Sequence, residues 1–159
     1  MPMTPLHFAV LAPINTIAPR KVSNVSFILA NLLADLPVLL HIYAMTVQEM
    51  GGPSVVGTLH GTPTHTFAGA LWLGLLVAII KPNKLNWWIG AFLGSITHVL
   101  LDMVVHSDVQ PFMPYLEGNP FFVEGSHGWL SLVLGMGLVW YVVTLLHQLR
   151  GDHRTKRIR

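Results

Sequence analysis

The sequence predicts an all-α fold, a polytopic membrane helical bundle with four to five transmembrane helices, of which the first is short or broken. Only 10% of its 159 residues are charged and 52% are hydrophobic, whereas soluble domains carry roughly 25% charged residues. Long apolar segments alternate with short connections, and Lys and Arg occur only in alternate connections and at the C-terminal end. The alternative is a water-soluble helical bundle, but this chain has too few polar residues to cover the surface of such a bundle.

Four apolar segments are long enough to cross or nearly cross a bilayer: Asn24–Met45, Thr66–Ile80, Asn86–Val105 and Gly128–Leu149. A spanning helix needs about 20 residues, with a range of about 17–25, so the second of these is short. A fifth segment, Pro5–Ala18, is shorter still and contains Pro13. Because proline interrupts helical hydrogen bonding, this segment is expected to form a broken or re-entrant helix.

The basic residues indicate an orientation. They lie between Pro5–Ala18 and Asn24–Met45, between Thr66–Ile80 and Asn86–Val105, and after residue 149. The other two connections carry only acidic charges, namely Glu49, Asp108, Glu117 and Glu124. The positive-inside rule places basic connections in the cytoplasm, which puts the N-terminus outside and the C-terminus inside. Residues 1–149 then form one membrane-embedded domain. Residues 150–159 form a basic cytoplasmic tail suited to anionic lipid rather than to nucleic acid.

Five ionisable residues are expected to share one layer of the membrane. Counted from the cytoplasmic end of each segment, Asp35 lies roughly 16 Å, His98 roughly 18 Å and Asp102 roughly 24 Å up. By the same count His65 lies roughly 24 Å up and His7 roughly 20 Å, or less if Pro13 breaks its helix. His98 and Asp102 are one helical turn apart, so they can face one ion from one helix.

This layer predicts a metal site. Ionisable groups inside a membrane face the bundle interior and find partners. Three histidines and two aspartates in a chain without cysteine suit Zn²⁺ or a similar divalent cation. Pro37 disturbs the helix close to Asp35, and irregular backbone at membrane depth is tolerated where it lines a polar cavity. The competing interpretation is a set of hydrogen-bonded structural residues.

Five stretches occur in an order that resembles a known family: "MPMTPLHF" (1–8), "ANLLADLP" (30–37), "LHGTPTHTFAGAL" (59–71), "GSITHVLLDMVVHSDVQPFMPY" (94–115) and "NPFF" (119–122). They are similar to small prokaryotic membrane proteins described as membrane-bound metal-dependent hydrolases, a group distantly akin to zinc-dependent phospholipases C. The resemblance runs from Met1 to about Phe122. It implies a polar set of six residues with Asp108 next to it: His7, Asp35, His60, His65, His98 and Asp102.

One position departs from the family pattern. Relatives often carry a second acid two residues after the position of Asp35, whereas this chain has Pro37. A second metal ion, or its affinity, is therefore in question.

The resulting functional expectation is a metal-dependent hydrolase of the prokaryotic cell membrane whose site opens to the extracytoplasmic face. Its expected metal ligands are His7, Asp35, His65, His98 and Asp102. Asp35 could instead be the general base, and His60 a ligand, a proton donor or a substrate contact. A site in the outer leaflet favours a lipid or lipid-linked ester, amide or phosphoester. The alternatives are a metal-ion or proton-coupled transporter, and a small structural subunit whose helices are held by metal.

Overall fold

The computed structural model describes residues 4–49 and 63–156, and all regular structure in these two ranges is helical. The predicted all-α class is thus confirmed for the described residues. The elements, in chain order, are α1 (Thr4–His7), η1 (Phe8–Val10), α2 (Leu11–Ile17), α3 (Asn24–Glu49), η2 (Pro63–His65), α4 (Phe67–Ala78), α5 (Leu85–Val105) and α6 (Ser126–Lys156).

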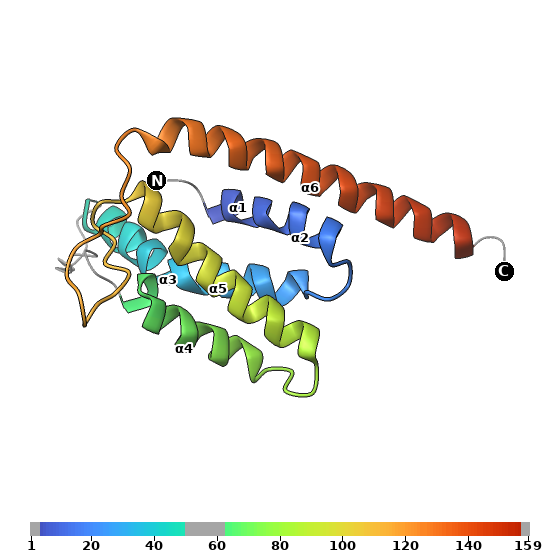
Figure 1. Ribbon diagram of the computed structural model, residues 1–159, viewed down its shortest axis with the longest axis horizontal. Helices are drawn as coiled ribbons and strands as arrows, with labels where there is room; N and C mark the ends of the chain where they lie inside the picture. The colour runs from blue at the N-terminus through green and yellow to red at the C-terminus, as the bar shows by residue number, and fades with distance from the viewer. Residues whose placement is uncertain (1–3, 50–62, 157–159) are drawn as a thin grey trace.

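Helix α5 is the centre of the bundle, packed against α3 on one side and α4 on another (Figure 1). Two glycines of α5 allow the approach of α3. A Cβ atom at Gly90 would collide with Ser26 and Ser23, and one at Gly94 with the backbone of Phe27. Small residues let helix backbones approach closely in membrane bundles, so α3 and α5 can bring side chains from opposite helices into contact.

Two apolar clusters fix this packing. One joins α3, α4 and α5 through Ala30, Val77, Ala78, Trp87 and Ala91. The buried Trp87 also donates a hydrogen bond from Nε1 to the carbonyl oxygen of Val77, at 2.7 Å. The other joins α2, α3 and α6 through Leu11, Ala12, Phe27 and Tyr141.

The predicted segment Pro5–Ala18, the first in chain order, is indeed broken. It runs as α1, then the 3-10 turn η1, then α2. Pro13 has no N–H for the carbonyl of Ala9, four residues earlier, and its ring crowds that carbonyl; Ala9 lies in η1. This short segment lies between α6 and the α3–α5 pair (Figure 1) and contacts α6 along its length.

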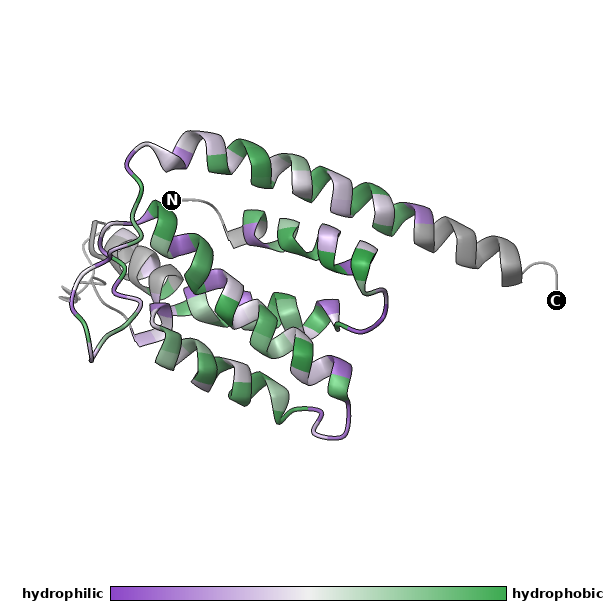
Figure 2. Cartoon of the chain, in the orientation of Figure 1, coloured by the Kyte–Doolittle hydropathy of each residue, from purple (hydrophilic) through white to green (hydrophobic). Residues whose placement is uncertain are grey.

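Two helical stretches are long and apolar enough to cross a membrane, Leu85–Val105 and Ser126–His147. Shorter apolar helical stretches are Phe8–Ile17, Asn24–Pro37 and Phe67–Ala78. Helix α4 has 12 residues and is therefore about 18 Å long, less than the roughly 30 Å of a hydrocarbon core. Figure 2 shows apolar residues along α4, α5 and α6, with hydrophilic residues concentrated in the connections.

The connections segregate by charge. The α2–α3 connection, with Arg20 and Lys21, and the α4–α5 connection, with Lys81 and Lys84, lie at the same end of the molecule as the C-terminal end of α6 (Figure 1). The α5–α6 connection, which carries the acidic residues Asp108, Glu117 and Glu124, lies at the opposite end. Helix α6 continues to Lys156, so the first residues of the predicted tail are helical.

Candidate metal centre

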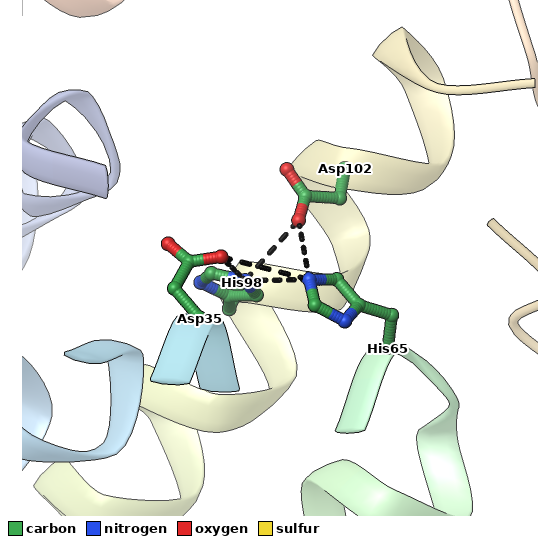
Figure 3. A group of neighbouring side chains, drawn as sticks. All are labelled: Asp35, His65, His98 and Asp102. Carbon is green, nitrogen blue, oxygen red and sulfur yellow. Dashed lines mark hydrogen bonds and ion pairs between the residues drawn. The ribbon is translucent and has the colours of Figure 1, made fainter. Parts of the chain in front are cut away.

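Four of the predicted residues meet between three elements. Asp35 comes from α3, His65 from η2 just before α4, and His98 and Asp102 from successive turns of α5. Their side chains point toward one another (Figure 3). One donor atom from each lies within 4.8 Å of every other.

Five of the six distances between these atoms are close to the edges of a tetrahedral set of ligands. His98 Nε2 lies 3.1 Å from Asp102 Oδ2, 3.3 Å from Asp35 Oδ1 and 3.4 Å from His65 Nε2. His65 Nε2 lies 3.4 Å from Asp102 Oδ2 and 3.6 Å from Asp35 Oδ1. Nitrogen or oxygen ligands about 2.0–2.1 Å from a tetrahedral zinc ion would lie about 3.3–3.4 Å from one another. Both the donor types and their spacing therefore fit a divalent metal.

Local structure at the start of α4 positions His65. Thr66 is the N-cap of α4, because its Oγ1 accepts a hydrogen bond from the N–H of Gly69 at 2.9 Å. On the ring of His65, Nδ1 lies 3.1 Å from Thr64 Oγ1. A proton on Nδ1, donated to that hydroxyl, leaves the lone pair of Nε2 directed at the cluster. Phe67, the first residue of α4, donates its N–H to the carbonyl of Pro111 at 2.9 Å, which ties the start of α4 to the α5–α6 connection.

His7 lies beside the cluster rather than among its four donor atoms. Its Nδ1 is 3.0 Å from Nδ1 of His98, the nitrogen that faces away from the other ligands. Its Nε2 is 3.3 Å from Oδ1 of Asp102, again the atom that does not face the cluster, and forms no hydrogen bond with the described residues. His7, which the sequence predicts as a ligand, is thus outside the four-atom group and contacts the side chains of two of its members, His98 and Asp102.

Sequence reasoning missed Asn31. This fully buried residue on α3 places Oδ1 3.3 Å from Nδ1 of His98. A signal for it exists in the sequence, because Asn31 precedes Asp35 by four residues and so shares its helix face. Its neutral side chain gave no electrostatic reason to select it.

The cluster is more open on one side. The side chains of His98 and Asp102 are 0% and 6% exposed, whereas those of His65 and Asp35 are 11% and 14% exposed. An ionised carboxylate as buried as that of Asp102 requires a compensating partner. A molecule entering the cluster from outside would meet Asp35 and His65 first.

The sequence also predicts His60 and Asp108 as site residues. His60 falls outside the described residues. Asp108 is exposed in the α5–α6 connection and does not belong to the four-atom group.

A second pair of histidines lies near the outer end of α5. The rings of His106, just past α5, and His127, in the first turn of α6, form an edge-to-face pair with centroids 5.3 Å apart. Burial lowers the pKa of His106 below its ordinary value, against the opposing effect of Asp102 and Asp108. This pair is one helical turn beyond Asp102 and is separate from the four-atom cluster.

Comparison with known proteins gives a family but no individual relative. Neither the curated proteins nor the solved structures contain a match to this chain. A family model described as YdjM inner membrane protein matches residues 4–156. The match covers all the described helices, including α6, whereas the motifs quoted in the sequence analysis end at Phe122, before α6 begins. The chain therefore belongs to the YdjM inner membrane protein family.

Proposed function

We propose that this protein is a membrane-embedded, metal-dependent hydrolase, with zinc as its metal, acting on a lipid or lipid-linked ester, amide or phosphoester. The observation that carries the proposal is the four-atom group of Asp35, His65, His98 and Asp102, in which the two histidine nitrogens lie 3.1–3.6 Å from each other and from the carboxylate oxygens. Such a group requires a stabilising partner inside an apolar bundle, because uncompensated ionisable side chains are costly there.

A metal accounts for the geometry better than hydrogen bonding alone. The Nε2 atoms of His65 and His98 lie 3.4 Å apart, and both also face the same two carboxylate oxygens. Each Nε2 carries at most one proton and can donate it well to only one acceptor. A cation at the centre would use the lone pairs of both Nε2 atoms and offset the charge of the carboxylates at once.

The residues divide naturally into ligands and a base. Catalytic zinc sites use three protein ligands and keep the fourth position open, whereas structural sites are closed by four. We assign His65, His98 and Asp102 as the ligands. Asp35, the most exposed of the four at 14%, is assigned to accept a proton from water. When bound, a divalent metal acidifies water and polarises the scissile group.

The membrane setting suggests the substrate. The cluster lies between helices whose outward faces carry large exposed apolar side chains, among them Leu32, Leu36 and Leu100. Such faces suit lipid as their surroundings, so the molecules best able to reach Asp35 and His65 are lipids and lipid-linked compounds. We further propose four to five membrane passages, with the N-terminus outside and the C-terminus in the cytoplasm, supported by the segregation of charge between the two ends.

The test compares Asp35→Asn with wild type after detergent purification without chelator. Elemental analysis gives metal content, and a panel of lipid esters, amides and phosphodiesters gives turnover. The substitution keeps the size of the side chain and an acceptor oxygen but removes the charge that general-base work requires, so turnover should fall about 10²–10⁴-fold. The matched control is Glu117→Gln, an exposed acid in the α5–α6 connection, which should leave turnover unchanged.

Two results would overturn the proposal. Less than about a tenth of an equivalent of metal in the wild type would remove the metal centre. Metal-dependent ion flux into proteoliposomes that is lost in Asp35→Asn, with no product from any lipid, would identify a transporter instead.

A further inference from the structure

We propose that Asn31 is a positioning residue that fixes the proton of His98 on Nδ1 and thereby turns the lone pair of Nε2 toward the metal. The inference rests on the metal centre of the proposed function. In that proposed function Asn31 contacts neither metal nor substrate. Its role is inferred from the hydrogen bonds of its side-chain amide.

The side-chain amide of Asn31 has one sensible orientation. Its Nδ2 donates to the carbonyl oxygen of Phe27 at 3.0 Å, within α3, and to that of Gly94 at 3.1 Å, across the α3–α5 contact. The reverse orientation would set Oδ1 against two carbonyl oxygens, which have no proton to offer. Both amide protons are therefore used, and Oδ1 is left as an acceptor.

This acceptor determines the state of His98. Oδ1 of Asn31 lies 3.3 Å from Nδ1 of His98, and an amide oxygen can only accept. Nδ1 must therefore carry the proton. In a neutral imidazole the other nitrogen, Nε2, then has the lone pair, and Nε2 is the atom that faces Asp35, His65 and Asp102.

The proton on Nδ1 of His98 also determines where the proton of His7 lies. Nδ1 of His7 lies 3.0 Å from Nδ1 of His98. One proton on His98 Nδ1 is then shared between Oδ1 of Asn31 and Nδ1 of His7, so Nδ1 of His7 is an acceptor and the proton of His7 is on Nε2. That atom lies 3.3 Å from Oδ1 of Asp102, a contact that lacks the geometry of a hydrogen bond. One amide orientation thus sets the protons of two histidines.

Partners of this kind orient metal-bound histidines and raise their basicity, and their loss typically costs 10–100-fold in metal affinity. The test uses two substitutions. Asn31→Leu removes both the donors and the acceptor, whereas Asn31→Asp keeps an oxygen toward Nδ1 and, as the protonated acid, can donate to only one of the carbonyls of Phe27 and Gly94. Both should lower thermal stability through the lost interhelical bond. Only Asn31→Leu should lower zinc affinity about 10–100-fold, with Asn31→Asp remaining close to wild type.

The control is Thr144→Val on α6. The hydroxyl of Thr144 donates to the carbonyl of Tyr141 at 2.8 Å, so its loss removes a hydrogen bond within a helix without touching Asn31 or His98. It should leave zinc affinity unchanged. Equal losses of zinc affinity in Asn31→Leu and Asn31→Asp would overturn the proposal, because they would show that only the helix contact matters.

A second measurement does not depend on metal. Nitrogen-15 NMR of histidine-labelled wild-type protein, with the His98 signals assigned by their loss in His98→Gln, should show a proton on Nδ1. That proton should persist in Asn31→Asp and exchange rapidly in Asn31→Leu. An unprotonated Nδ1 in the wild type would overturn the role of Asn31. Absence of zinc from a wild type with a protonated Nδ1 would instead overturn the metal centre and leave the role of Asn31 standing.

Discussion

The two ring nitrogens of His98 face different partners, and this difference separates candidate ligands from supporting residues. Nε2 faces two carboxylates and a second imidazole, while Nδ1 faces Asn31 and His7. Residues on the Nε2 side share one small space that a cation could fill. Residues on the Nδ1 side contact the rear of a ligand, and their loss should weaken binding rather than abolish it.

His7 and His98 should therefore differ in a metal-binding measurement. His98→Ala removes a proposed ligand and should reduce zinc occupancy of the purified protein to near background. His7→Ala removes only contacts to the outer sides of His98 and Asp102, so it should lower zinc affinity about 10–100-fold. Competition with a chromophoric chelator gives both values.

His147→Ala is the matched control, since His147 is exposed on α6 and should leave zinc affinity as in the wild type. If His7→Ala abolished occupancy as completely as His98→Ala, His7 would be a ligand, as its depth in the membrane suggested from sequence.

At the scale of helices, the close approach of α3 and α5 is what lets side chains from both enter one cluster. Asn31 reaches the carbonyl of Gly94 at 3.1 Å, and a Cβ at Gly94 would collide with the backbone of Phe27. The obstacle is backbone, which cannot rotate away. Widening this crossing would move Asp35 and Asn31 away from His98 together.

Gly94→Ala should thus damage both stability and the site. Overpacking a contact of this kind costs about 1–3 kcal/mol, visible as a lower melting temperature in detergent. Zinc affinity should fall as well, because α3 carries Asn31, which contacts Nδ1 of His98. Gly135→Ala is the control: a Cβ there meets nothing within 4 Å, so both quantities should be kept. A normal zinc affinity in a destabilised Gly94→Ala protein would show that the site does not depend on this crossing.

Much of this arrangement was open to prediction from sequence. Apolar segments and Pro13 gave the helices and the break in the first one. A rise of about 1.5 Å per residue placed Asp35, His65 and His98 at similar depth, and the structure does bring them together with Asp102.

Counting along a helix gives depth but not the direction in which a side chain points. For that reason the depth of His7 suggested a ligand, whereas the structure places it against His98 Nδ1. Asn31 is neutral, so the pattern of charges did not identify it. The close approach of α3 and α5 at Gly94 depends on which helices pair, and the depth of a residue in the membrane does not indicate that pairing.

For the whole molecule, the distribution of charge between its two ends is the main evidence for its orientation in the membrane. The basic α2–α3 and α4–α5 connections share one end with the C-terminal end of α6, and the acidic α5–α6 connection lies at the other (Figure 1). The candidate cluster is nearer the acidic end, because His98 and Asp102 lie in the last two turns of α5. If basic connections remain in the cytoplasm, the cluster belongs to the extracytoplasmic half of the membrane.

Cysteine labelling in intact cells should reveal this orientation directly, since the native chain has no cysteine to interfere. Asp108→Cys and Glu117→Cys place thiols on exposed positions of the α5–α6 connection, and Lys84→Cys and Arg20→Cys place them on exposed positions at the basic end. An impermeant maleimide should label the first pair in intact cells and the second pair only after the membrane is opened. Labelling after opening also controls for reactivity, because each thiol must react there. The reverse pattern would put the acidic end in the cytoplasm. The cluster would then face the inner leaflet, and the lipids able to reach Asp35 and His65 would be those of the cytoplasmic side.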